Sequence, residues 1–345
     1  MTDKTLNPKL FDDDIEMKPS RDGFGEGLVI AADENPNVVG LCADLTESTR
    51  MEAFKKKFPE RFIEVGVAEQ NMVTVASGMA HDGKIPFTAS YATFSPGRNW
   101  EQIRTTICYN NVPVKIVGSH AGISVGPDGA THQALEDIAM MRVLPNMVVV
   151  VPADAIEAKK ATIAISKNGK PSYLRLSRDK VPVITTENSP FEIGKAEVLV
   201  QGNPSTGSTS SQQAGSGRFA SATLIACGQM VYMALKVAKE LEKDNISVRV
   251  INCHTIKPLD KKTILAAAEE TGAIVTAEEH QINGGLGGAV AEVVSESYPV
   301  PIKRIGIEDH FGESGAPAEL LKKFGLTTEH IKKAVLEVLR RKKNV

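Results

Sequence analysis

Among the residues of this sequence, a glutamate at the start of a helical pattern is the one best placed to do chemistry. Glu69 lies within residues 64–71, EVGVAEQN. The apolar residues that follow it share one helical face: Met72, Val73, Val75, Ala76, Met79 and Ala80. A first-turn acid complements the helix dipole, and most such glutamates have no other role. Apolar neighbours favour the protonated form of the Glu69 carboxyl, whereas the helix N-terminus favours the ionised form. The sequence therefore does not decide whether Glu69 is protonated.

Two further segments carry side chains suited to ligand binding. Tyr91 and Phe94 are three residues apart in a chain with only 5% aromatic residues, and this spacing lets both line one wall. Ordinary core packing is the alternative for both. Residues 126–133, GPDGATHQ, contain glycines that allow close approach of the backbone to a ligand. Asp128 and His132 there can present a carboxylate and an imidazole beside sugar hydroxyls, unless the segment is only a turn followed by a helix cap.

The elements that position these residues follow from the alternation of apolar runs and helical patterns. The runs that read as strands buried on both faces are 38–42, 112–117, 147–151 and 172–174. Between them we expect helices around 22–33, 68–81, 97–108, 134–142 and 154–167. Residues 1–190 are therefore predicted to form an α/β domain with a mainly parallel sheet covered by helices.

A second α/β domain of the same kind is predicted over residues 191–345, with the boundary near 180–193, where prolines break the periodicity. Its expected strands are 223–227, 248–251, 274–276 and 302–307, and its expected helices are 230–242, 260–271, 286–297, 317–324 and 328–341. Residues 202–217 are rich in Gly, Ser, Thr and Gln, which is typical of a flexible segment. Strand-like runs flank it, so we interpret it as a loop inserted within the second domain.

Composition excludes several classes of protein. The 345 residues carry a net charge of −2 and are 42% hydrophobic, as in ordinary soluble domains. That charge provides no general attraction to nucleic acid or to an anionic membrane. The four cysteines are far apart and form no CxxC pair, which argues for reduced thiols and against a zinc site, and we expect no metal ligands on this chain. The N-terminus is polar and acidic, and no segment is apolar and long enough to span a bilayer, so we expect a cytoplasmic protein.

In their order along the chain, residues 64–71, 90–94 and 126–133 resemble the pyrimidine-binding half of transketolase and its thiamine-diphosphate relatives. The resemblance extends from Arg21 to the last helices. It implies transfer of a two-carbon ketol unit from a ketose phosphate to an aldose phosphate through a carbanion of thiamine diphosphate. By resemblance, Glu69 bonds a ring nitrogen of the cofactor's pyrimidine and promotes its imino form. Tyr91 and Phe94 then form the aromatic platform for that ring.

The same resemblance implies roles for the remaining candidates. Asp128 and His132 correspond to residues that contact the hydroxyl groups of the ketose donor during catalysis. The positions that bind the sugar phosphate in transketolases are matched here by Arg21, Ser48, His120 and Arg178. An arginine fork suits phosphate geometry. Asp44 follows the first buried strand, where open α/β sheets place ligands, and we expect it near the cofactor.

One expected motif is absent from this sequence. Thiamine-diphosphate enzymes hold the diphosphate through a divalent metal, with a Gly-Asp-Gly signature followed later by Asn. None of the three Asp-Gly pairs here, which begin at Asp22, Asp82 and Asp128, has a preceding glycine. The chain therefore resembles the C-terminal subunit of a split transketolase. We expect an N-terminal partner subunit that binds Mg²⁺ or Ca²⁺ and the diphosphate, in an assembly of two copies of each chain.

Three other functions are kept as alternatives. Deoxyxylulose-5-phosphate synthase has similar motifs, but it usually has His where this chain has Asn71 and Arg where this chain has His120. The beta subunit of 2-oxo-acid dehydrogenases lacks the Asp-Gly-x-Thr-His-Gln loop. A non-catalytic regulatory subunit is disfavoured because decay of the site would have removed some of its polar residues.

Two segments of the second domain are predicted to be structural. The glycines of residues 283–288 do not have the spacing of a nucleotide-binding G-x-G-x-x-G motif. Residues 278–280 and 309–315 also resemble the C-terminal domain of transketolases, and we expect no chemistry from either.

Overall fold

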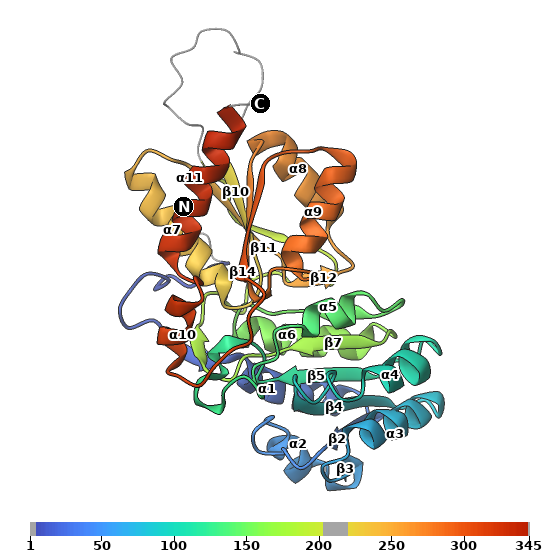
Figure 1. Cartoon of the computed structure of the whole chain (residues 1–345). Helices are drawn as coiled ribbons and strands as arrows, with labels where there is room; N and C mark the ends of the chain where they lie inside the picture. Colours follow the sequence, from blue (N-terminus) through green and yellow to red (C-terminus); the bar gives the residue numbers. More distant parts are fainter. Residues whose placement is uncertain (1–4, 203–219, 344–345) are drawn as a thin grey trace.

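The computed structural model describes residues 5–202 and 220–343, which form two α/β domains stacked on one another (Figure 1). The expected fold class, two domains with mainly parallel sheets covered by helices, is confirmed. Most of the predicted insertion at 202–217 lies outside the described residues. None of the described helices is long and apolar enough to cross a membrane.

The first sheet has seven strands in the order β12-β6-β7-β5-β4-β2-β3. Their bounds are β2 Val38–Cys42, β3 Phe62–Glu64, β4 Ile85–Tyr91, β5 Lys115–Ser119, β6 Val148–Val150, β7 Ser172–Arg175 and β12 Thr255–Lys257. All neighbouring pairs are parallel except β12 with β6. The parallel strands therefore end at one common edge of the sheet, and this edge carries the candidate site.

The helices of this domain connect its parallel strands. They are α1 Ser20–Glu34, α2 Glu52–Lys57, α3 Glu69–His81, α4 Trp100–Gln102, α5 Asp137–Arg142 and α6 Ala155–Lys167. α4 continues as a π-helix, η2 (Ile103–Cys108), and two 3-10 helices, η1 (Pro59–Arg61) and η3 (Ile123–Asp128), lie in the loops. A small antiparallel ribbon joins β1 (Met17–Pro19) to β8 (Lys180–Pro182).

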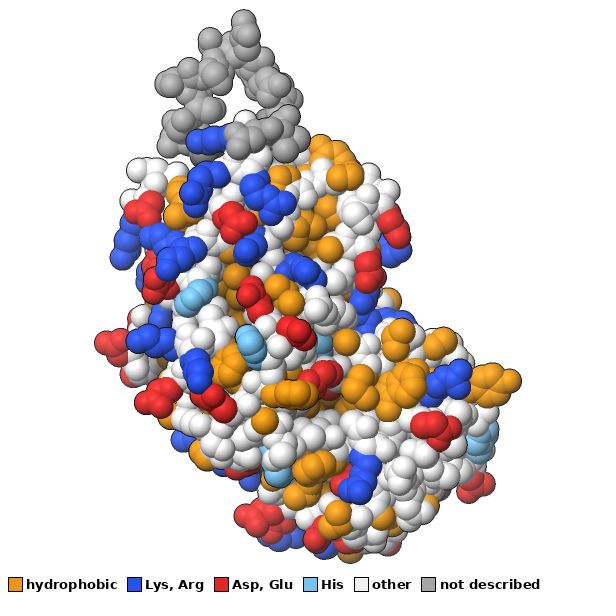
Figure 2. Space-filling model, in the orientation of Figure 1, with side chains coloured by type: hydrophobic (Ala, Val, Ile, Leu, Met, Phe, Trp, Pro, Cys, Tyr) orange, Lys and Arg blue, Asp and Glu red, His pale blue; other side chains and the backbone are white. Residues whose placement is uncertain are grey.

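The second sheet has five strands in the order β14-β13-β10-β11-β9, and only the β9–β11 pair is antiparallel. The strands are β9 Glu197–Val200, β10 Ala222–Ala226, β11 Val248–Asn252, β13 Ile274–Gln281 and β14 Ile302–Ile307. The helices are α7 Met230–Lys243, α8 Lys261–Thr271, α9 Leu286–Ser297, α10 Pro317–Lys323 and α11 Thr328–Lys343. On the face in Figure 2, basic and acidic side chains are intermixed, in keeping with the small net charge.

Three strands of the first sheet differ from the sequence-based expectation, and one of them is the short β3, which was not predicted. β4 was not predicted, because Pro86, Thr88 and Ser90 interrupt its apolar pattern, yet it is a central strand in which Thr88 and Ser90 are fully buried. β12 comes from the second half of the chain and pairs with β6, so the first sheet draws on residues from both sides of the predicted boundary.

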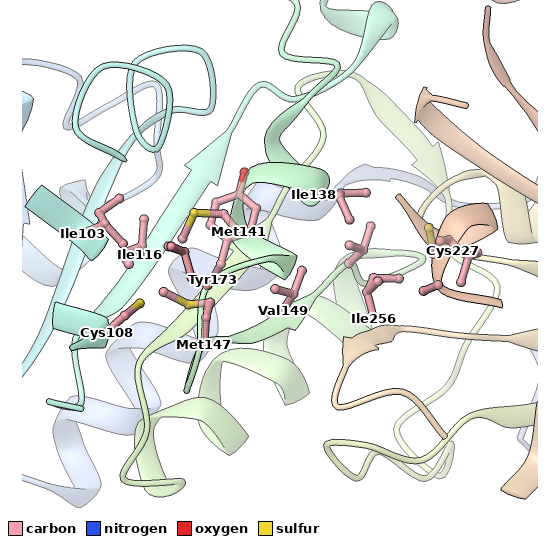
Figure 3. Close-up of a cluster of buried hydrophobic side chains, with 14 of the residues drawn as sticks. Ile103, Cys108, Ile116, Ile138, Met141, Met147, Val149, Tyr173, Cys227 and Ile256 are labelled. Atoms are coloured by element: carbon pink, nitrogen blue, oxygen red, sulfur yellow. The ribbon is translucent and has the colours of Figure 1, made fainter. Parts of the chain in front are cut away.

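The apolar core is continuous between the domains. One cluster of buried side chains includes Ile103 and Ile116 of the first domain together with Cys227 and Ile264 of the second. Figure 3 follows this cluster past Val149 and Ile256, where β6 and β12 are neighbours. Burial of apolar surface across this junction fixes the relative position of the two domains.

Candidate functional site

The candidate site lies at the edge where the parallel strands of the first sheet end. Tyr91, at the end of β4, is in register with Ser119, at the end of β5. Two helices begin at the same edge, α1 with Arg21 in its first turn and α3 with Glu69. Helix N-termini carry unpaired N–H groups and partial positive charge, so this edge is suited to anions and polar ligands.

A hydrogen-bonded chain connects three of the predicted phosphate-binding residues. Nη1 of Arg21 donates to the backbone carbonyl of Ser48 at 2.7 Å and to Nε2 of His120 at 3.1 Å. Nε of Arg21 is buried and has no partner among the described residues. One edge of this guanidinium is thus held by the protein, while the other has donors left for a ligand.

The fourth predicted phosphate-binding residue, Arg178, lies close enough to His120 for its charge to lower the pKa of that imidazole. Its Nη1 donates to the carbonyl of Val125 at 3.0 Å. Burial first, and then the positive charges of Arg21, Arg178 and Arg50, lower the pKa of His120 to about 3. His120 is therefore neutral near pH 7, and the positive charge here comes from the guanidinium groups.

The aromatic residues form a row. The rings of Tyr91 and His120 stack with centroids 3.9 Å apart, and Phe94 lies 6.0 Å from Tyr91. The ring of His132 meets Phe94 edge-on at 5.4 Å. One face of Tyr91 is thus covered by His120. The structure brings all four predicted residues together in one aromatic wall, with an imidazole at each end.

The carboxylate of Glu69 is almost entirely enclosed. The residue is 3% exposed, and its Oε2 is a buried atom without a hydrogen-bond partner among the described residues. Asn99, which sequence reasoning missed, donates to the backbone carbonyl of Glu69 at 3.0 Å and to Ser95 Oγ at 3.2 Å. Asn99 therefore connects the first turn of α3 to the turn that contains Phe94 and Ser95. A buried polar atom left unpaired is costly, so Oε2 is a natural attachment point for a ligand donor.

The loop over 126–133 has a backbone that requires glycine at two positions. Gly126 and Gly129 have φ values of 81° and 77°, and a Cβ on Gly129 would lie 2.6 Å from Ser314 Oγ. The Asp128 side chain is exposed, and Thr131 Oγ1 lies 2.9 Å from Nδ1 of His132. The buried amide of Gln133 donates to the carbonyls of Ile123, Gly126 and Glu313. The loop is therefore held in shape from both domains.

The second domain supports this loop through a residue for which the sequence predicted only a structural role. An oxygen of Glu279, on β13, accepts a hydrogen bond of 2.6 Å from the backbone N–H of Ser124. Its other oxygen is hydrogen-bonded to Gln229, and its backbone carbonyl accepts from Arg175 at 2.8 Å. Arg175 in turn pairs with the buried Asp137 at 2.8 Å. No local pattern in the sequence signals these long-range contacts.

Asp44 lies apart from the other predicted residues. Its carboxylate is exposed and has no hydrogen bond within the described parts of the chain. Its backbone N–H donates to Glu64 at 2.8 Å, and Glu64 also accepts from Gly66 and Thr46. The structure places Asp44 at the same sheet edge, just beyond β2, without joining it to the other predicted residues.

The chemistry of these residues fits one half of a cofactor site. The enclosed carboxylate and the aromatic wall suit a flat nitrogen heterocycle, which offers N–H donors and stacking faces. Within residues 5–202 and 220–343, no group of three or more His, Cys, Asp or Glu side chains is arranged to hold a metal ion. The described residues therefore supply side chains suited to a heterocycle but no recognisable metal ligand set.

Comparison with known proteins identifies the family. A family model for the transketolase pyrimidine-binding domain matches residues 16–183, and one for the transketolase C-terminal domain matches residues 220–331. The chain belongs to the transketolase family and corresponds to the C-terminal part of its members. The first match implies dependence on thiamine diphosphate.

Proteins similar to this chain include separate subunits of about the same length. It is 42% identical to a putative transketolase C-terminal section from Methanocaldococcus jannaschii, over 94% of this chain and 97% of that protein. It is 39% identical to a 6-deoxy-6-sulfo-D-fructose transketolase subunit from Clostridium sp., over 96% and 98%. A solved split-gene transketolase, described as an inactive beta4 tetramer, superposes with a TM-score of 0.83 at 43% identity, over 93% of this chain and 98% of that one. By contrast, the chain covers only 50% of the transketolase of Campylobacter jejuni, which has a TM-score of 0.76 and 25% identity.

Proposed function

We propose that this chain is the pyrimidine-binding subunit of a two-chain transketolase that becomes active only with an N-terminal partner subunit. The observation that carries the proposal is the buried, unpartnered Oε2 of Glu69, in a helical turn whose backbone carbonyl Asn99 connects to Ser95, the residue after Phe94. A carboxylate enclosed in this way is destabilising unless a ligand donor completes it. The family match to a pyrimidine-binding domain supports the identity of that ligand.

Each residue of the site has a part in this proposal. Thiamine diphosphate, when bound, supplies a nucleophilic carbon that carries the two-carbon unit. Glu69 holds a nitrogen of its pyrimidine ring, and Tyr91 and Phe94 contact the face of that ring. Asp128 and His132 bind hydroxyl groups of the ketose donor, and Asp44 lies near the cofactor.

The sugar phosphate binds at the His120 end of the aromatic row, opposite the end formed by His132. The guanidinium groups of Arg21 and Arg178 supply the positive charge, with Ser48 and His120 beside them. Guanidinium groups bind phosphate through paired charge-assisted hydrogen bonds, which fix both its position and its orientation.

The partner subunit provides what the described residues lack. We propose that it binds the diphosphate through Mg²⁺ or Ca²⁺ and that two copies of each chain assemble. The supporting observations are the absent Gly-Asp-Gly signature and the similarity to separate subunits.

The direct test is reconstitution. Mixing this chain with the candidate N-terminal subunit, thiamine diphosphate and Mg²⁺ is expected to give ketol transfer from xylulose 5-phosphate to ribose 5-phosphate, with neither chain active alone. A parallel assay with pyruvate and glyceraldehyde 3-phosphate tests the deoxyxylulose-5-phosphate synthase alternative. Calorimetry on this chain alone should show weak cofactor binding. Tight, magnesium-dependent binding by the single chain would contradict the two-chain proposal.

A further inference from the structure

Ser119, to which no role was assigned, is the last residue of β5 and is fully buried. Its Oγ lies 2.9 Å from Nδ1 of His120. The neighbouring Tyr91 ring stacks on the imidazole and limits its rotation. His120 itself has a left-handed backbone with a φ of 56°, which is uncommon for a residue with a Cβ. The orientation of this imidazole is therefore determined by three separate constraints.

The direction of the hydrogen bonds follows from the chemistry of arginine. A guanidinium has donors and no acceptor, so Nε2 of His120 must accept from Nη1 of Arg21. A neutral imidazole that accepts at Nε2 carries its proton on Nδ1. Nδ1 then donates to Ser119 Oγ. The low pKa of His120, about 3, keeps the ring in the neutral form that this arrangement requires.

The same geometry decides which atoms of Arg21 can meet an anion. Both hydrogens of Nη1 are used, one by the carbonyl of Ser48 and one by His120. Nε is buried without a partner among the described residues. The edge formed by Nε and Nη2 is therefore the one available for two parallel hydrogen bonds to an oxyanion.

We propose that Ser119 is a positioning residue for the anionic end of the substrate: its hydroxyl accepts from Nδ1–H of His120 and so stabilises the tautomer in which Nε2 accepts from Nη1 of Arg21, which leaves the Nε–Nη2 edge of Arg21 for the anion. The proposal rests on the proposed transketolase function. Without the Ser119 hydroxyl, the buried Nδ1–H group loses its acceptor, so this tautomer keeps only its hydrogen bond to Arg21.

The test compares Ser119→Ala, Ser119→Thr and Ser172→Ala in the reconstituted enzyme. Ser172 is a matched control: it is fully buried, hydrogen-bonded and located at the opposite end of the same sheet. For Ser119→Ala, we expect KM for xylulose 5-phosphate to rise about 3- to 10-fold, the effect of one hydrogen bond, with little change in kcat. With hydroxypyruvate, which lacks a phosphate, KM should stay within about twofold. Ser119→Thr should restore the wild-type values, and Ser172→Ala should leave the ratio of the two KM values unchanged.

A spectroscopic measurement separates this proposal from the proposed function. Long-range ¹H–¹⁵N correlation spectra of the ¹⁵N-histidine-labelled chain are expected to show His120 as the Nδ1–H tautomer, and Ser119→Ala should shift it toward Nε2–H. A charged or Nε2–H His120 in the wild-type chain would overturn the proposal, as would an equal rise in KM for both donors. Failure of wild-type reconstitution would contradict the transketolase function, while the tautomer would still be measurable.

Discussion

The carboxylate of Glu157 and the side-chain amide of Asn252 join the two domains by a buried hydrogen bond of 2.7 Å. Glu157 lies on α6 of the first domain, and Asn252 ends β11 of the second. The other oxygen of Glu157 accepts from the backbone N–H of Ala153 at 2.6 Å. Burial, reinforced by the charge of Asp154, raises the pKa of Glu157 to about 8.

This junction predicts a pH dependence of stability. Between the unfolded pKa of about 4.3 and the folded value, the folded chain keeps a proton that the unfolded chain has released. Glu157 therefore lowers the free energy of unfolding by up to about 1.4 kcal/mol per pH unit as the pH rises. Lys115 acts in the opposite sense above pH 7, because burial lowers its pKa to about 7.

The comparison of wild type with Glu157→Gln isolates the contribution of Glu157 from that of Lys115. In denaturant unfolding between pH 5.5 and 8, the stability of the wild type relative to this variant should fall steadily with pH. The exposed Glu242→Gln is the control and should run parallel to the wild type. A difference between wild type and Glu157→Gln that does not change with pH would mean that Glu157 is ionised in the folded chain throughout this range.

Glu69→Gln is expected to lower turnover of the reconstituted enzyme far more than it affects folding. Its Oε2 has no partner among the described residues, so an amide of the same shape breaks no hydrogen bond there. Loss of a group that acts on protons typically costs ~100- to 10,000-fold in rate. The measurement is kcat at saturating cofactor together with the melting temperature, with the exposed Glu60→Gln as control. A near-normal kcat would remove Glu69 from the mechanism.

Arg178→Ala is expected to discriminate between donors. Losing a charge-assisted hydrogen bond to the phosphate costs roughly 1.5–3 kcal/mol, or about one to two decades in kcat/KM for xylulose 5-phosphate. Hydroxypyruvate has no phosphate and should be used almost as well as by the wild type. Arg340→Ala, on the exposed side of α11, is the matched control. Equal losses with both donors would indicate that Arg178 acts by supporting the loop through Val125, with which it is hydrogen-bonded.

Replacing residues 202–217 with a short linker is expected to leave stability and activity nearly unchanged. Their Gly- and Ser-rich composition offers little apolar surface to bury. The strands that they connect, β9 and β10, flank β11 in one sheet, about 10 Å apart. A linker of about six residues spans that distance. Thermal melting and the ketol-transfer assay would check the deletion, and a large fall in melting temperature would show that the segment packs against the domain.

The sequence by itself determined those features that depend on local pattern. The apolar run at 38–42 has the same bounds as β2, and the helix expected over 68–81 matches α3 to within one residue. The placement of Glu69 in a first helical turn follows from the same periodicity, because helix starts and apolar faces are encoded by neighbouring residues. β4 escaped prediction because a strand buried in the middle of a sheet can carry polar residues when their backbone is paired on both sides.

Only the tertiary structure decided which groups meet. Arg21 and His120 are 99 residues apart, and Ser124 and Glu279 are 155 apart, so no local pattern could pair them. The partner of Ser119, the free edge of Arg21 and the addition of β12 to the first sheet likewise follow from strand order and helix placement. Burial supplies the physical reason: enclosed polar atoms must find partners wherever the fold brings them, and those partners are set by geometry in space.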